Sequence, residues 1–198
     1  PKLMDNLIEF CFEKSIHIQD DDIISNARIS TIELHSENAH DVELKGLYIS
    51  KVNFHECSFN RLNITDCVLK ECDFSNIQIP ESILHRVEFE NCKLLGSDFS
   101  RSSFRSVVFT ECGADYSAFT ESTFKDVLIK DTSLKEADFY NTSFNRVVLS
   151  NNMLRQSQFS GAKLNGLDFS ECDIEGIGVR LEDLVGATLS SLQAINIV

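Results

Sequence analysis

One stretch of sequence decides the fold: residues 102–129 read SSFRSVVFTECGADYSAFTESTFKDVLI. Every fifth position in this stretch is apolar, namely Phe104, Phe109, Ala114, Phe119, Phe124 and Ile129. The same register runs without a slip from Ile24 to Ala194, and it includes every phenylalanine of the chain except Phe10 and Phe12. A period of five matches neither the turn of a helix nor the alternation of a flat strand, so the chain must turn a corner about once per repeat.

A longer period shows how many corners close one coil. Residues 102–109, 122–129 and 142–149 each begin with two hydroxyl residues and a phenylalanine, end in three apolar residues, and align at a spacing of 20 residues. Four five-residue repeats therefore complete one square coil. Two positions before each apolar centre lies a second inward position for smaller residues, and it holds every cysteine except Cys11. Such coils would stack through a continuous apolar interior, as in other solenoids.

Three stretches match a known repeat motif: CDFSN at 72–76, ADFYN at 137–141 and LDFSE at 167–171. They resemble the pentapeptide-repeat family, whose motif is a small residue, Asp or Asn, Leu or Phe, and two polar residues. The resemblance extends over most of the chain and implies an all-β fold. It implies a right-handed quadrilateral β-helix of about eight to nine coils with no internal loop insertions.

Both ends of such a rod need covers, because an open β-helix exposes unpaired strand edges. Residues 1–21 lie outside the register and alternate apolar residues, which predicts a strand-like N-terminal capping segment. The β-helix is predicted over 22–188, and the apolar tail 189–198 is predicted to cap the last coil or to form a homodimer at the rod end. The residues expected to do so are Leu189, Leu192, Ile195, Ile197 and Val198.

Composition limits the class of protein. No stretch reaches the roughly 18 consecutive apolar residues of a membrane helix, and the N-terminus lacks signal-peptide features, so we expect a cytoplasmic protein with no membrane partner. An odd count of 7 cysteines in a chain of this size favours reduced thiols over a disulfide framework. The net charge of −13 argues against direct nucleic-acid binding, because phosphate contacts need lysine and arginine.

No group of residues has the pattern of a catalytic, cofactor or metal site. Cys72, Cys92 and Cys112 would stack in successive coils, but small inward positions favour cysteine simply as a packing residue, and no CxxC pair occurs. His35 and His55 lie one coil apart, with ordinary surface positions as the favoured interpretation over a metal. The serines fill repeat positions without a histidine and aspartate beside them. We therefore predict no enzyme activity, no cofactor and no metal.

Two surface features stand out when outward residues are sorted by face. Three faces are acidic, and the fourth carries a basic ladder of Lys45, Arg86, Arg105, Lys125, Arg146 and Lys163, interrupted by Glu43, Asp66 and Asp126. Another face carries an apolar ladder of Val68, Val108, Leu128 and Val148, where the motif would usually have Asp or Asn. Contiguous exposed apolar area can mark an interaction site. The competing interpretation is that β-branched residues simply favour a flat sheet.

The C-terminal region narrows the resemblance. Residues 176–187, GIGVRLEDLVGA, followed by Gln193 and Ala194, are similar to the endings of quinolone-resistance and mycobacterial fluoroquinolone-resistance proteins. This resemblance implies a rod that mimics a DNA duplex and acts on type II topoisomerases. The unbroken register leaves no projecting loops of the kind found in plasmid-borne quinolone-resistance proteins, which points to a mimic of the mycobacterial type.

Two hypotheses of function follow. In the first, the chain binds DNA gyrase or topoisomerase IV and modulates it or protects it from quinolones or related toxins. The phosphate surrogates would be Glu71, Glu88, Glu90, Glu111, Asp131, Asp73, Asp115 and Glu136. In the second, the chain is a protein–protein interaction scaffold or immunity factor that docks an unidentified protein through the apolar ladder or the basic face.

Overall fold

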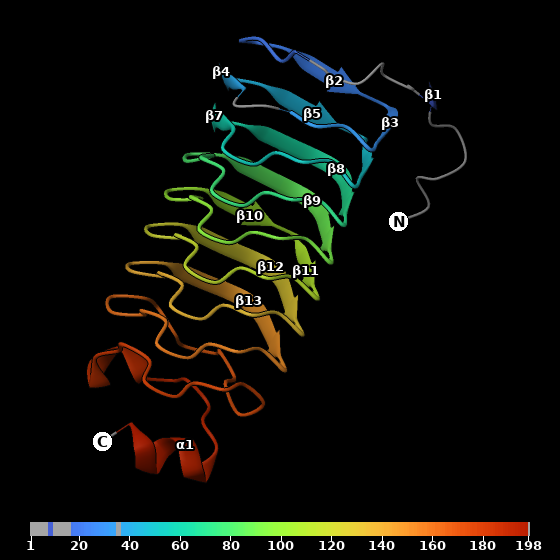
Figure 1. Ribbon diagram of the computed structural model, residues 1–198. Helices are drawn as coiled ribbons and strands as arrows, with labels where there is room; N and C mark the ends of the chain where they lie inside the picture. Colours follow the sequence, from blue (N-terminus) through green and yellow to red (C-terminus); the bar gives the residue numbers. More distant parts are fainter. Residues whose placement is uncertain (1–7, 10–16, 35–36, 198) are drawn as a thin grey trace.

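The computed structural model describes residues 8–9, 17–34 and 37–197, and the chain forms a rod of stacked coils (Figure 1). The strands are β1 (Ile8–Glu9), β2 (Ile23–Ser25), β3 (Ala27–Ser30), β4 (Asn38–His40), β5 (Glu43–Lys45), β6 (Tyr48–Ser50), β7 (Ser58–Asn60), β8 (Asn63–Lys70), β9 (Ile83–Glu90), β10 (Ser103–Arg105), β11 (Val108–Thr110), β12 (Thr123–Lys130) and β13 (Ser143–Ser150). A 3₁₀ turn η1 (Leu181–Leu184) and a short helix α1 (Ser191–Asn196) follow.

Neighbouring coils pair in parallel with an offset of 20 residues. Leu84 pairs with Ile64 on one coil, and Phe104 pairs with Phe124 on another. The same offset continues through isolated bridges as far as Asp168 and Thr188. The predicted all-β β-helix is therefore confirmed, and no insertion interrupts it between these positions.

Each coil has four faces, which we number in chain order. In the coil that begins with β9, the inward centres of the first to fourth faces are Leu84, Phe89, Leu94 and Phe99. The first and second faces are built from the named strands β8 to β13. The third and fourth faces are held mainly by single bridges, such as Asp73 to Lys93 and Gln78 to Asp98.

The interior is the predicted apolar column. Phe99, Phe119, Phe139 and Phe159 stack on the fourth face, with successive ring centroids 5.3, 5.1 and 4.9 Å apart. Parallel offset rings at this spacing add to the free energy gained by burying each side chain. The smaller inward column is also buried, and its polar groups bond to the neighbouring coil, as Ser97 Oγ does to the carbonyl of Phe74 at 2.9 Å.

The corners depend on a left-handed backbone at every fifth residue. Glu111 has φ 54° and Asp131 has φ 50°, and the series of such residues extends along the rod. This conformation costs a non-glycine residue free energy, but it lets the corner N–H reach the next coil, as Glu111 N–H does to the carbonyl of Lys130 at 3.1 Å. The second polar position of the repeat is therefore a conformational requirement as well as a surface position.

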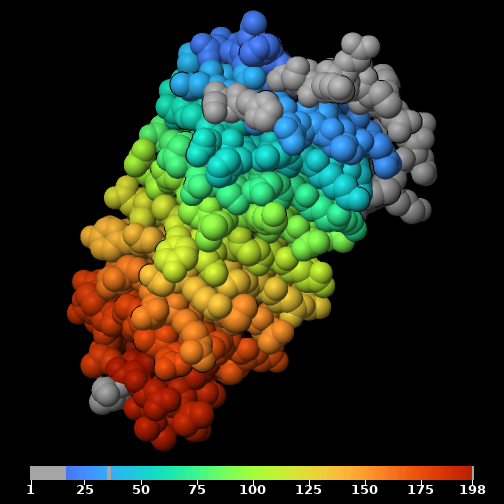
Figure 2. Space-filling model, viewed as in Figure 1, coloured from blue at the N-terminus to red at the C-terminus, as the bar shows by residue number. Residues whose placement is uncertain are grey.

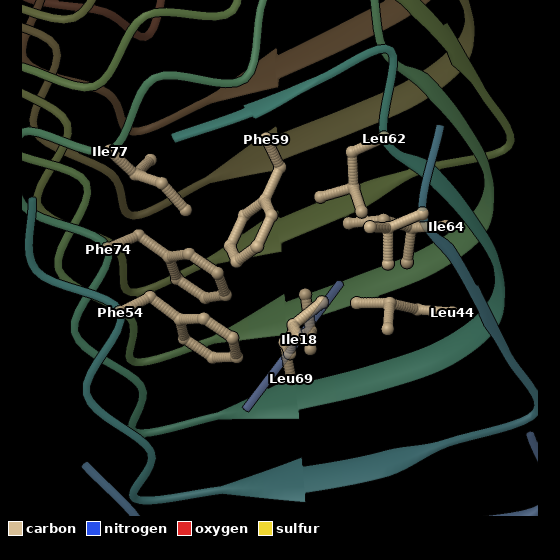
Figure 3. Close-up of a pocket in the computed structure, with 10 residues that line it drawn as sticks. Ile18, Leu44, Phe54, Phe59, Leu62, Ile64, Leu69, Phe74 and Ile77 are labelled. Atoms are coloured by element: carbon tan, nitrogen blue, oxygen red, sulfur yellow. The ribbon is translucent and has the colours of Figure 1, made fainter. Parts of the chain in front are cut away.

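The first coils are closed on their apolar interior by Ile18. Figure 3 shows its side chain among Leu44, Phe54 and Leu69, and it is 7% exposed. The space left there is an apolar cavity of about 10 Å³, which is only the size of one water and offers no polar partner for it. Within the predicted capping segment, β1 pairs with β3, while Phe10 and Phe12 lie outside the described residues.

The last coil ends differently from the predicted register. Ala194 was expected to be an inward centre, but it is exposed and belongs to α1. The reason is local: Ser190 and Gln193 form a capping box, which starts a helix where another repeat would have begun. The Gln193 side-chain amide also donates to the carbonyls of Phe169 and Cys172, both at 2.8 Å, so α1 covers part of the open edge.

Candidate interaction surfaces

The eight carboxylates predicted as phosphate surrogates lie on two adjacent faces and their corners. Glu88 and Glu90 point outward from the second face. The corner to the third face carries Glu71, Glu111 and Asp131, Asp73 and Asp115 lie on the third face, and Glu136 lies at its far corner. The structure thus gathers these residues along one side of the rod rather than around it.

Most of these carboxylates have a partner one coil away. Lys70 bonds Glu90 at 2.6 Å, Lys51 lies 3.7 Å from Glu71, and Lys93 lies 3.4 Å from Asp73. Asp131 accepts from Asn151, Asp115 accepts from the hydroxyl of Ser133, and Glu136 accepts from Tyr116, which raises the pKa of that tyrosine. Among the described residues, Glu88 and Glu111 form no ion pair.

The apolar ladder is shorter than its sequence suggests. Val108, Leu128 and Val148 are paired in register on successive coils, and Val148 is 57% exposed. Glu88 separates Val68 from Val108. On the other side, Tyr48 pairs with Val68 and lies under the Arg28 guanidinium at 4.6 Å. Tyr48 is a member of this ladder that was missed, although it stands 20 residues before Val68.

The first face contains the basic ladder, but the structure divides it into two columns. Arg86 and Arg146 lie at the corner, and each binds a carboxylate of the preceding coil, Asp66 and Asp126 respectively. These hydrogen bonds hold the pKa of Asp66 and of Asp126 below the usual range. Lys45, Arg105 and Lys125 lie in the neighbouring outward column and form no ion pair among the described residues.

The C-terminal end exposes several large apolar side chains together. Leu181 is 68% exposed and Val185 72%, while Leu192 and Ile195 in α1 are 69% and 71% exposed. Leu189 and Ile197 are partly buried against the core, and Val198 lies outside the described residues. A groove of about 670 Å³ separates α1 from residues 172–179 of the last coil. Figure 1 places α1 beyond the last coil, at the tip of the rod.

The histidines are not brought together. His55 Nδ1 bonds the carbonyl of Ser75 at 2.9 Å, and His35 lies outside the described residues. In the described part of the chain, one group has metal-compatible spacing, namely Asp21, His40 and Asp41, all exposed and with ligand atoms within 4.8 Å of one another. Arg61 binds both oxygens of that Asp41 carboxylate and lowers its pKa to about 2, so the carboxylate is already used by a cation.

The stacked thiols are buried as packing residues. Cys72, Cys92 and Cys112 are at most 3% exposed, and each donates to backbone carbonyls, as Cys92 Sγ does to Leu69 at 3.3 Å. Hydrogen bonding with Cys112 and Cys72, together with burial, raises the pKa of Cys92. Because the thiolate is the nucleophile and the metal ligand, a raised pKa makes this thiol unreactive.

Comparison with known proteins identifies the family. The family profile described as "Pentapeptide repeats (8 copies)" matches residues 40–77, and the one described as "Pentapeptide repeat region" matches residues 82–159. Together they span more than half of the chain. The chain belongs to the pentapeptide-repeat family. A search of curated proteins finds no match to this pentapeptide-repeat sequence.

Solved structures of other family members are similar to this pentapeptide-repeat protein at low identity. HetL, involved in heterocyst differentiation regulation in the cyanobacterium Nostoc, is 12% identical, with 85% of this chain and 87% of that chain covered and a TM-score of 0.47. A trypsin-treated form of QnrB1, a plasmid-mediated fluoroquinolone resistance protein, is 17% identical over 92% of this chain and 94% of that chain, with a TM-score of 0.46.

Membrane insertion through a helix finds no support in this pentapeptide-repeat protein. Within the described ranges, no helix has the length and apolar character needed to cross a bilayer.

Proposed function

We propose that this chain is a non-enzymatic DNA mimic that binds a type II topoisomerase, DNA gyrase or topoisomerase IV. Binding would modulate the enzyme or protect it from quinolones or related toxins. The proposed phosphate surrogates are the carboxylates of the second and third faces, and a cytoplasmic location is part of the proposal because the partner acts on chromosomal DNA.

The observation that carries this proposal is the acidic side of a straight rod in a chain of net charge −13. Columns of outward residues repeat at the coil spacing of roughly 4.8 Å, so carboxylates in one column form a regular anionic row. A surface on a topoisomerase that binds duplex phosphates offers lysine and arginine, and such a surface would attract this row. Glu88 and Glu111 contribute most in this proposal, since the other surrogates share their charge with a neighbouring coil.

The test is gyrase supercoiling with added protein, at low and moderate salt, with and without a fluoroquinolone. Inhibition or drug protection that weakens as salt rises supports mimicry, because screening shortens the range of the attraction. No effect at any protein concentration in this assay and in a topoisomerase IV decatenation assay would reject the proposal.

A matched pair of variants tests which side of the rod is used. Glu111 and Glu121 are both exposed corner residues with φ 54° and 57°, but Glu121 lies at the corner between the fourth and first faces. Glu111→Gln is expected to raise the protein concentration for half-maximal effect by roughly two- to fivefold. Glu121→Gln should leave it unchanged, and an equal effect of both would indicate dependence on net charge alone.

An interaction scaffold that docks a partner through the apolar ladder is the second candidate. It rests on the exposure of Val148 beside Leu128 and Val108. Leu128→Asp should then abolish partner binding while salt has little effect, the reverse of the behaviour expected for mimicry.

We also propose that the protein is a homodimer through its C-terminal end. Leu192 and Ile195 are exposed apolar residues on the same short helix, and burying them would remove apolar area from water. Light scattering should give a dimer mass for the wild type and a monomer mass for Leu192→Glu. Ile83→Glu, at another exposed apolar position on the first face, serves as the control and should remain dimeric.

A further inference from the structure

The first face carries a continuous outward column that contains no carboxylate. Register pairing places Lys45, Thr65, His85, Arg105, Lys125 and Asn145 on successive coils. Lys45, Arg105 and Lys125 are exposed. Because the protein as a whole is strongly acidic, an unbroken column of cationic and neutral residues requires an explanation beyond solubility.

The carboxylates nearest to this column are already bound. At the corner beside it, Arg86 binds Asp66 through two hydrogen bonds, and Arg146 binds Asp126 in the same way. These pairs consume the negative charge of that corner without using Arg105 or Lys125. The column cations therefore keep their charge for a group outside the chain.

The electrostatic environment of His85 agrees with this description. Burial lowers its pKa, and the charges of Arg86 and Arg105 lower it further, against an opposing contribution from Asp66. The net field at the middle of the column is thus positive.

A second outward column on the same face supplies neutral donors. Ser103, Thr123 and Ser143 are paired in register two positions before the cationic column. Hydroxyl groups can donate to a carboxylate whose charge is held by the neighbouring Arg105 or Lys125. At the C-terminal end of the face, Asn145 and Arg146 line a hollow of about 350 Å³ with Phe144 and Leu167.

We propose that the first face is a docking site for an extended acidic segment of a partner protein, whose carboxylates bind Arg105 and Lys125. The dimensions suit a single peptide chain: four coil steps from Lys45 to Lys125 span on the order of 20 Å, about the length of six extended residues. The strip is one column wide, since the far corner carries Glu81 and Glu121. A wide polyanion such as a duplex would meet those carboxylates and the net negative charge of the protein.

The test uses a fluorescently labelled oligoglutamate peptide and the full chain, with binding followed by polarisation at low salt. Arg105→Gln combined with Lys125→Gln should weaken binding by roughly tenfold or more. Lys93→Gln combined with Lys130→Gln removes the same charge from the third and second faces and should change binding by less than about twofold. Arg105→Lys combined with Lys125→Arg keeps the charge and should retain binding.

Three outcomes would overturn the proposal. They are no saturable binding of the peptide to the wild type, an equal loss in both glutamine pairs, and binding of an oligothymidylate of matched charge as tight as that of oligoglutamate. All variants change exposed side chains, and circular dichroism with thermal melting verifies that each is folded. The inference does not depend on topoisomerase binding, because the residues that it uses lie on a different face from the acidic row.

Discussion

Truncation of Phe119 tests the stacked core most directly. Its side chain is 2% exposed, and its ring stacks between those of Phe99 and Phe139 at 5.3 and 5.1 Å. It also meets the edges of Phe104 and Phe124 at 5.9 and 5.7 Å. Phe119→Ala therefore removes contacts with three successive coils, and the rod has no flexible segment at this point to fill the space.

The expected cost follows from these contacts. Removing a buried phenylalanine side chain costs about 3–5 kcal/mol, and the aromatic pairs favour the upper half of that range. Phe144 provides a matched comparison in the same repeat register. It is only partly buried, and it lines the surface hollow beside Asn145, so Phe144→Ala should cost less, about 1–3 kcal/mol.

Urea unfolding followed by far-ultraviolet circular dichroism measures both values. The reasoning is refuted if Phe119→Ala loses less than about 1 kcal/mol, or if Phe144→Ala is the more damaging of the two variants. A large loss for Phe119 with a small one for Phe144 would show that stability depends on enclosure by neighbouring coils and not on repeat position alone.

Three further predictions follow from the corners, the C-terminal end and the thiols. Gly161 has φ +75°, and an added Cβ would lie 2.2 Å from Asn141 Oδ1, so Gly161→Ala should cost about 1–3 kcal/mol, whereas Gly113→Ala, with no atom within 4 Å of the new Cβ, should be nearly neutral in the same urea titration. The hydrogen bonds from Arg180 and from the backbone of Gly161 lower the pKa of Asp183 to about 2, so its contribution to stability is present above the unfolded pKa of about 3.9 and is lost as pH falls towards 2. Thermal melting should accordingly show wild type and Asp183→Asn differing at neutral pH and converging in acid, and a constant difference would contradict the assignment. Burial raises the pKa of Cys67 to about 11, and the other described cysteines are also buried, so in a Cys11→Ser variant no thiol should react with a thiol reagent at mildly alkaline pH until the protein unfolds. Rapid labelling of the native variant would show that the cysteine column is accessible.

Sequence reasoning located the interior well because the repeat is local and strict. Phe104 and Phe124 are buried where the period of five placed them, and the 20-residue alignment matched the observed coil pairing. The cysteine column was equally predictable, since a small inward position admits few other residue types. In each case a residue's place in the repeat decides its direction, whatever its neighbours are.

The surface was less predictable because charge there depends on the next coil. Glu90 and Glu111 occupy similar positions in the sequence pattern, yet Lys70 binds Glu90 and no ion pair forms at Glu111 among the described residues. The pairs of Arg86 with Asp66 and of Arg146 with Asp126 likewise join residues 20 positions apart. Opposite charges at that spacing were a usable signal, since one coil separates them, but face-by-face sums of charge conceal it.

The sequence by itself determined a four-sided parallel solenoid, its inward columns and its acidic balance, because burial of an apolar residue at every fifth position requires that geometry. Only the tertiary structure decided where the repeat stops, which carboxylates keep an uncompensated charge and which cations face solvent alone. The end of the register at Ser190 depends on a capping box that competes with one more coil. The charge pattern depends on side chains meeting across a gap of roughly 4.8 Å between coils, a distance that exists only after the chain has folded.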